Sequence, residues 1–258
     1  MAPLINQFDP PRATGRKRED PRKILDALIF RFRTGCQWNQ LPAYLGDDST
    51  VHRTFQRWVR LGLFERIWSL LVAECDELGL VEWDSQAADA TLGKARCGGD
   101  AVGPNPTDRA KNGTKKSLLV DGQGGPLAIV VAAANVNDHL LLEETFAACV
   151  VERPASESGQ AEQLCLDAGY DNAPSREVVA ASGYQGHIRS GSEVPPTPGA
   201  KRYPARRWVV ERTIAWLSRC RGLLIRYEKK AANYLGLLRL ACALLWYRRL
   251  AAADCIES

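Results

Sequence analysis

Three acidic residues stand where carboxylates from separate elements could meet. Asp89 ends an extended segment, Asp167 ends the apolar run 164–166, and Glu211 lies on a stretch with helical spacing. Hydrolysis or transfer of a phosphodiester needs a deprotonated nucleophile and a stabilised leaving oxygen. Two divalent ions about 3.5–4 Å apart do both, and Mg²⁺ prefers carboxylate oxygens. If the three acids converge at one edge of a sheet, they are candidate ligands for two such ions.

Each acid also has an ordinary explanation. Arg207 and Glu211 are four residues apart, which is the spacing of an ion pair on a solvated helix. Asp84 and Asp121 are rivals for the first acid, but Asp84 lies one turn too early and Asp121 opens a glycine turn that explains it. Asp167 is the least ordinary, because an acid that directly follows a buried run must be satisfied internally or bind something.

The first part of the chain is predicted to be a small helical unit. Asp20 before Pro21 is a capping sequence, and the apolar residues that follow recur at helical spacing. A later helix begins at Asp48, and another spans 63–78 and ends at Gly79. The helix from Asp48 carries four polar side chains on one side, His52, Arg53, Gln56 and Arg57. It is a candidate recognition helix of the helix-turn-helix kind, and the local pattern leaves open an ordinary helix with a solvated basic face.

From residue 80 the pattern changes to strands and helices. The expected order is a strand over 81–89, a hairpin of 118–120 and 126–133, a helix over 139–150, a strand over 163–167, a helix over 173–181, a strand over 184–189, and helices over 205–219 and 233–249. This order predicts an α/β fold with a mixed sheet of the ribonuclease-H kind. No G-x-G-x-x-G opens a helix, and no P-loop is present. We therefore expect a helical region over 1–79 and an α/β domain over 80–258.

Composition narrows the class of protein. The net charge is only +4, but the basic residues gather in the stretches 12–33, 96–116 and 202–230. Eight scattered cysteines without a C-x-x-C pair, and only three histidines, argue against a zinc site and for a reducing compartment. The chain starts without a signal peptide, and the apolar segment 234–246 is too short to cross a membrane. We expect a soluble, cytoplasmic protein.

Three segments of this sequence closely resemble bacterial insertion-sequence transposases of the DDE class. They are Gly103-Pro104-Asn105-Pro106-Thr107-Asp108-Arg109, Asp167-Ala168-Gly169-Tyr170-Asp171 and Arg206-Arg207-Trp208-Val209-Val210-Glu211-Arg212-Thr213. The resemblance is to the group called insertion sequence five, within the wider insertion sequence four-like class. It extends to residues 33–38, 41–42 and 226–230 and covers nearly the whole chain.

The resemblance implies a ribonuclease-H-like catalytic core with an N-terminal DNA-binding region. It implies a triad of Asp89, Asp167 and Glu211 that binds two Mg²⁺ or Mn²⁺ ions. Such an enzyme binds terminal inverted repeats, cleaves the ends of the element and transfers the 3′-hydroxyl strand to target DNA. The alternatives are a purely hydrolytic nuclease of the ribonuclease-H kind and a transposase-derived DNA-binding protein without catalysis. The sequence departs from the family pattern at Pro204, where a tyrosine is usual, and at Ser218, where a lysine is usual.

Double-stranded DNA is the partner that the resemblance implies, bound by a dimer or larger assembly in association with the nucleoid. Candidate phosphate contacts outside the helical region are Lys111, Lys115, Lys116, Arg207, Arg212, Arg219 and Arg221. Plain solvation explains any one of these charges equally well. As a set they favour DNA, because affinity from phosphate neutralisation accumulates with each charge.

Overall fold

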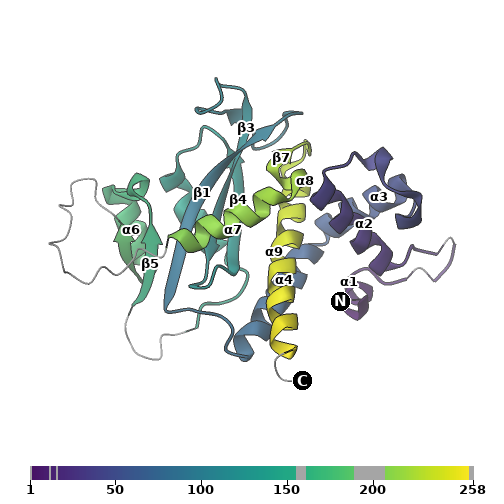
Figure 1. Ribbon diagram of the computed structural model, residues 1–258, viewed down its shortest axis with the longest axis horizontal. Coiled ribbons are helices and arrows are strands. Elements are labelled where there is room, and N and C mark those ends of the chain that lie inside the picture. The colour runs from purple at the N-terminus through teal and green to yellow at the C-terminus, as the bar shows by residue number, and fades with distance from the viewer. Residues whose placement is uncertain (1, 12, 16, 155–160, 189–206, 256–258) are drawn as a thin grey trace.

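A mixed β-sheet forms the centre of the computed structural model, which describes residues 2–11, 13–15, 17–154, 161–188 and 207–255 (Figure 1). The five main strands are β1 Ser85–Ala95, β3 Asn112–Val120, β4 Pro126–Ala133, β5 Glu162–Leu166 and β6 Tyr184–Ile188. β3 pairs antiparallel with both β4 and β1, while β5 pairs parallel with both β1 and β6. This antiparallel-then-parallel order confirms the predicted α/β fold of the ribonuclease-H kind.

Two short strands extend the sheet through contacts that are distant in sequence. β2, Gly103–Pro104, pairs with β3, and β7, Ile225–Arg226, pairs in parallel with the end of β1. The buried guanidinium of Arg226 donates to the carbonyls of Ala101, Glu228 and Lys229 at 2.8–3.1 Å. These bonds fasten the segment after α8 to the strand edge.

The turn between β3 and β4 depends on Asp121, which is completely buried. Its Oδ1 accepts from the backbone N–H groups of Gln123 and Gly125, and its Oδ2 accepts from Glu82 N and Arg249 Nη1. Asp121 is therefore a turn-forming residue, as the sequence indicated, and its carboxylate is fully used in holding the hairpin.

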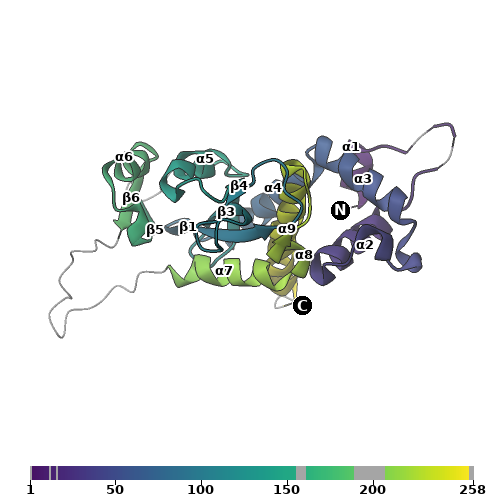
Figure 2. The same cartoon turned by 90° about the horizontal axis from the view of Figure 1, so that it is seen from above.

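Helices surround the sheet and form the N-terminal region. The α-helices are α1 Ala2–Phe8, α2 Pro21–Thr34, α3 Asp48–Arg60, α4 Leu63–Glu77, α5 Leu142–Ala147, α6 Ala173–Ala181, α7 Trp208–Arg219, α8 Arg221–Leu224 and α9 Ala231–Asp254. Four short 3₁₀ turns are η1 Trp38–Gln40, η2 Ala43–Leu45, η3 Asp138–Leu141 and η4 Ala168–Tyr170. Figure 2 shows α7 on one face of the sheet and α5 on the other. Among the described residues, none of the helices has the length and apolar character to cross a bilayer.

Local capping explains where α2 and α3 begin. Asp20 accepts from Arg22 N at 2.9 Å with Pro21 in the first turn, and Asp47 accepts from Thr50 N at 2.8 Å. α2 ends at Gly35, whose φ of 72° is left-handed. An added Cβ there would lie 3.0 Å from Arg221 Cβ, so the glycine also permits α8 to approach.

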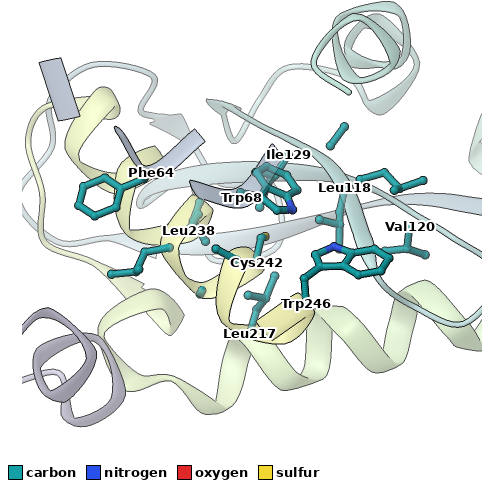
Figure 3. Packing of buried hydrophobic residues seen from close by; sticks show 14 of the residues in the cluster. Phe64, Trp68, Leu118, Val120, Ile129, Leu217, Leu238, Cys242 and Trp246 are labelled. Atoms are coloured by element: carbon teal, nitrogen blue, oxygen red, sulfur yellow. The ribbon is translucent and has the colours of Figure 1, made fainter. Parts of the chain in front are cut away.

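One hydrophobic core joins the helical region to the sheet. Trp68 of α4 and Trp246 of α9 donate their indole N–H groups to the same carbonyl, that of Pro126, at 3.1 and 2.6 Å. Figure 3 shows side chains from α4, α7, α9 and the sheet in one buried cluster. The boundary predicted at residue 79 therefore stays a prediction, because α4 packs along α9 of the second region.

Several predicted boundaries differ from the structure. The strand expected over 81–89 is β1, which starts at Ser85 and continues to Ala95, so Asp89 lies inside the strand and not at its end. The reason is that β3 begins at Asn112, within the stretch expected to be a loop, and gives β1 a long partner. The first residues of the helix predicted over 205–219 lie outside the described part of the chain, as do Tyr203, Pro204 and residue 189.

Candidate active site

Asp89 and Asp167 lie side by side in the sheet. β1 and β5 pair in parallel with Ala87 opposite Cys165. Two residues further along the same register, Asp89 stands beside Asp167, at the point where β5 ends. Thr91 follows Asp89 on the same face of β1 and contacts the space under α7. The two aspartates therefore meet on the α7 face of the sheet, whereas the sequence predicted the convergence of all three acids.

The environment of Asp89 disfavours its charged form. Burial raises the pKa of this carboxyl to about 6, and the neighbouring Asp167 and Asp138 carboxylates also act to raise it. The backbone N–H of Ala90, which donates to Asp89 Oδ1 at 2.8 Å, and the charge of Arg207 oppose the rise. A site that raises the pKa of an acid through burial and like charges is one that a cation would stabilise.

Asp167 is held by its own turn. Its Oδ1 accepts from Gly169 N at 2.9 Å, which caps η4 directly after β5. A side chain at position 169 would lie 3.0 Å from that oxygen, so glycine is needed for the close approach. The turn fixes the direction of the Asp167 side chain before anything binds.

Glu211 lies apart from this pair. It is in the first turn of α7, its side chain is 48% exposed, and its Oε1 pairs with Arg207 Nη2 at 2.7 Å. The ion pair on a solvated helix is therefore present. In the described chain, no three acidic, histidine or cysteine side chains lie close enough together to hold a metal ion. Since the charge of Arg207 also acts on Asp89, this arginine stands between the aspartate pair and Glu211.

α7 is anchored so that Glu211 stays near the sheet. Thr213 Oγ1 donates to Gly124 O at 2.7 Å, and Arg212 donates to Gln123 O in the same turn. The buried side of the helix is made by Val209, Val210, Thr213 and Leu217. The donor chemistry thus fits a divalent cation at Asp89 and Asp167, while the third carboxylate is engaged by Arg207.

Asp138 and Tyr170 border the aspartates and were missed from the sequence. Asp138 starts η3, pairs with Lys115 Nζ, and is close enough to Asp89 to affect its charge. Tyr170 ends η4, which packs against η3. The only signals in the sequence were that Asp138 is an acid before a helical run and that Tyr170 follows Asp167 by three residues.

A hollow of about 190 Å³ between the β3–β4 turn, α7 and α9 is a separate feature, and no acid lines it.

Three of the four side chains predicted to read DNA from α3 are engaged within the protein. His52 stacks on Trp38 with ring centroids 4.3 Å apart, and its Nε2 lies 3.2 Å from Gln56 Nε2. Burial lowers the pKa of His52, and the charge of Arg31 lowers it further. Arg57 donates to both carboxylate oxygens of Asp9 at 2.8–3.1 Å.

Arg53 is the fourth side chain of the predicted set, and it is exposed on α3, where it donates to Ser49 O at 3.2 Å. It is the member of this set that the described structure leaves accessible to a partner. A recognition role for α3 remains a prediction that would require His52, Gln56 and Arg57 to exchange their internal partners.

Two lysines of the predicted basic track lie inside the protein. Lys115 donates to Val136 O at 2.5 Å and pairs with Asp138, and Lys116 points to the α7 face among apolar side chains. Both residues are buried, so neither presents its ammonium group on the surface as the prediction required. Lys111 is exposed and lies 4.0 Å from Asp108.

Four arginines form a basic surface where α2, α7, α8 and α9 meet. Arg219 and Arg221, both predicted, flank Cys220 and are exposed. Arg33 and Arg248 lie near Cys220 as well. Burial raises the pKa of the Cys220 thiol, and the charges of these two arginines act to lower it. No described acidic residue forms an ion pair with any of the four, which we call the arginine surface: Arg33, Arg219, Arg221 and Arg248.

Comparison with known proteins identifies the family. Residues 1–68 match the family model described as "Putative transposase of IS4/5 family", and residues 84–246 match "Transposase DDE domain". A putative transposase for insertion sequence element IS402 of Burkholderia cepacia is 35% identical over 168 residues, which are 62% of this chain and 74% of that protein. An uncharacterised 16.2 kDa protein of the same element is 29% identical over 110 residues, 41% of this chain and 75% of that protein.

The crystal structure of the catalytic domain of Mos1 mariner transposase overlaps 73% of this chain and 91% of that chain, at 9% identity and a TM-score of 0.31. The assignment rests on the sequence matches, which include the segments that carry Asp89, Asp167 and Glu211. The chain belongs to the DDE transposase family.

Proposed function

We propose that the protein cleaves DNA at the ends of an insertion element and joins the freed 3′-hydroxyl to target DNA, with two divalent ions held by Asp89, Asp167 and Glu211. The observation that supports this proposal is the aspartate pair, since the parallel register of β1 and β5 brings two carboxylates side by side on the α7 face of the sheet. Divalent cations bound there would neutralise the phosphate and activate the attacking oxygen. Mg²⁺ and Mn²⁺ are the ions that such oxygen ligands suit.

Arg207 would change partner when DNA binds. A phosphate near the aspartates competes with Glu211 for the guanidinium, because Arg207 is already close enough to act on Asp89. Glu211 would then be free to turn toward the aspartates by side-chain rotation. Thr213 and Arg212 hold the backbone of α7 on the β3–β4 turn, so the helix itself need not move.

The DNA backbone would lie along the arginine surface, with Lys111, Arg212 and Arg53 as further contacts. These side chains are exposed, whereas Lys115 and Lys116 are not. Joining two DNA ends requires at least two active sites, so we expect a dimer or larger assembly on terminal inverted repeats. The Arg207–Glu211 pair also supports a second candidate function, because it engages the third carboxylate and so keeps it from a metal ion. This candidate is a DNA-binding protein of the same family that does not cut DNA.

A cleavage and strand-transfer assay with terminal-repeat DNA and Mn²⁺ separates these functions. Asp89→Asn is expected to abolish both reactions and leave DNA binding intact. Asp84→Asn is the matched control, because Asp84 is exposed before the same strand and should be dispensable. Unchanged products from Asp89→Asn would overturn the catalytic assignment. Cleavage without joined 3′ ends would indicate a hydrolytic nuclease.

A further inference from the structure

The hydroxyl of Tyr170 is a buried donor without an acceptor. The residue is 1% exposed, and its hydroxyl makes no hydrogen bond within the described chain. Buried hydroxyls are nearly always paired, because leaving one unpaired is unfavourable. Tyr184 follows the usual rule, since its hydroxyl donates to Gln86 Oε1 at 2.8 Å.

Tyr170 lies close to the aspartates, because it ends η4, which directly follows Asp167 and packs against η3. Burial raises the pKa of Tyr170, and the three carboxylates that act on it further are those of Asp138, Asp89 and Asp167. These acids come from η3, β1 and the end of β5, so the tyrosine ring stands where the three elements meet. Its hydroxyl is therefore buried near carboxylates, and none of the described oxygen atoms is within hydrogen-bonding geometry of it.

Asp138, in the turn η3 that packs against η4, is paired with Lys115. Its Oδ1 is buried and accepts no directed hydrogen bond, although Lys115 Nζ pairs with it. Lys115 is itself fixed by its bond to Val136 O. Of the Tyr170 hydroxyl and Asp138 Oδ1, the hydroxyl is the polar atom that has neither a hydrogen bond nor an ion pair among the described residues, and a ligand bound beside it would relieve that cost.

We propose that Tyr170 is a positioning residue of the cation site, whose hydroxyl donates to an oxygen in the coordination shell once a divalent ion is bound to Asp89 and Asp167. A cation would draw the mutually repelling carboxylates together and bring an oxygen within reach of the hydroxyl. This inference rests on the proposed function, since it requires the aspartates to bind metal.

The test compares Tyr170→Phe with Tyr184→Phe in the full chain, by thermal unfolding at increasing Mn²⁺ concentration. Without metal, Tyr170→Phe should melt at or above the wild-type temperature, because it removes an unpaired hydroxyl. Tyr184→Phe should melt lower, because it breaks a formed bond. With metal, Tyr170→Phe should need roughly 10-fold or more Mn²⁺ for half of the stabilising shift, and Tyr184→Phe should need the wild-type concentration. Cleavage by Tyr170→Phe should fall at low Mn²⁺ and recover as Mn²⁺ increases.

Four outcomes overturn the inference. If Tyr170→Phe lowers the metal-free melting temperature and keeps the wild-type Mn²⁺ midpoint, the tyrosine only supports packing. If both variants shift the midpoint equally, the effect is not specific to this hydroxyl. If the wild type gives no Mn²⁺ shift and Asp89→Asn behaves identically, the metal site of the proposed function fails together with this inference. A wild-type shift with an unaffected Tyr170→Phe leaves the proposed function standing and removes the inference alone.

Discussion

Two neighbouring lysines illustrate how far the function of a residue depends on which face of a strand it occupies. Lys115 and Lys116 are consecutive on β3, so their side chains point to opposite faces of the sheet. Lys115 meets η3 and is paired with Asp138, whereas Lys116 meets α7 and lies among Leu118, Ile214 and Leu217. The sequence presents them as equivalent positive charges. In the structure, Lys115 makes stabilising contacts, whereas Lys116 is a buried charge without a described partner.

Replacing Lys116 by methionine should stabilise the protein. Burial lowers the pKa of Lys116 from an ordinary 10.5 to about 8, so the folded state disfavours the charged amine. Below pH 8 this penalty is fully present, and it disappears as pH rises from 8 to 10.5, because the unfolded chain then binds more protons. Lys116→Met should raise the free energy of unfolding at pH 7 by about 1–3 kcal/mol. Urea unfolding at pH 7 and pH 9.5 should show the gain shrinking at the higher pH.

Lys115→Met is the matched control for this prediction. It removes the bond to Val136 O and the pairing with Asp138, and it should lower stability by about 1–3 kcal/mol. Equal effects of the two substitutions, or a gain for Lys116→Met that does not change with pH, would contradict the assignment of Lys116 as a buried charge.

At the scale of elements, the sequence predicted those helix starts and turns that depend on contacts between neighbouring residues. The start of α2 follows from Asp20 with Pro21, an N-cap followed by proline. The hairpin of β3 and β4 follows from its turn. Such features need only neighbouring residues, and sequence analysis found them.

Elements that depend on distant partners were missed or displaced. β7 exists because Ile225 pairs with Lys94, and the full length of β1 depends on β3. The pairing of Asp89 with Asp167 was predicted only as convergence, since the β1–β5 register that creates it joins residues about 80 positions apart in the sequence. For the same reason, Tyr170 and Asp138 could not be placed beside Asp89 without the packing of η3 on η4.

A buried ion pair joins α2 to the segment that precedes α9. Arg31 Nη2 lies 2.7 Å from Glu228 Oε1, both side chains are less than 10% exposed, and the guanidinium covers the Trp38 ring at 4.0 Å. Arg31→Met should destabilise the protein by about 3–5 kcal/mol, because it leaves Glu228 buried without its partner. The double variant Arg31→Met with Glu228→Met should recover most of that loss. Urea unfolding of the four proteins gives the coupling energy.

The more exposed pair of Lys23, on α2, and Glu19, which precedes that helix, is the control for this cycle. Its N–O distance is 3.1 Å, but both side chains are more than a third exposed. Lys23→Met should change stability by less than about 1 kcal/mol. If Arg31→Met lowered the free energy of unfolding as little as Lys23→Met does, the proposed contribution of the Arg31–Glu228 pair to stability would be wrong.

At the scale of the whole molecule, the shared core keeps the N-terminal helices fixed against the sheet. Gly236 of α9 allows this closeness, because an added Cβ would lie 2.7 Å from Val59 Cγ2 on α3. Trp68 and Trp246 meet at Pro126 O, and Cys75 Sγ lies 3.8 Å from Trp246 O. The arginine surface, which takes residues from both regions, therefore lies on elements that pack against one another.

That continuity predicts how DNA affinity depends on salt. If the arginine surface binds phosphates, each arginine releases counterions, and log K falls with log[salt] by about 0.9 per contact. Arg219→Gln or Arg248→Gln should each reduce the slope by about 1, and the combined variant of all four arginines should reduce it by about 3–4. Fluorescence anisotropy with a terminal-repeat duplex between about 50 and 200 mM salt measures this slope.

Arg176→Gln is the control, because Arg176 is exposed on α6 but paired with Asp171 at 2.6 Å. A slope that is unchanged in the fourfold variant would place the DNA on another face, and a loss of equal size in Arg176→Gln would reduce the effect to net charge.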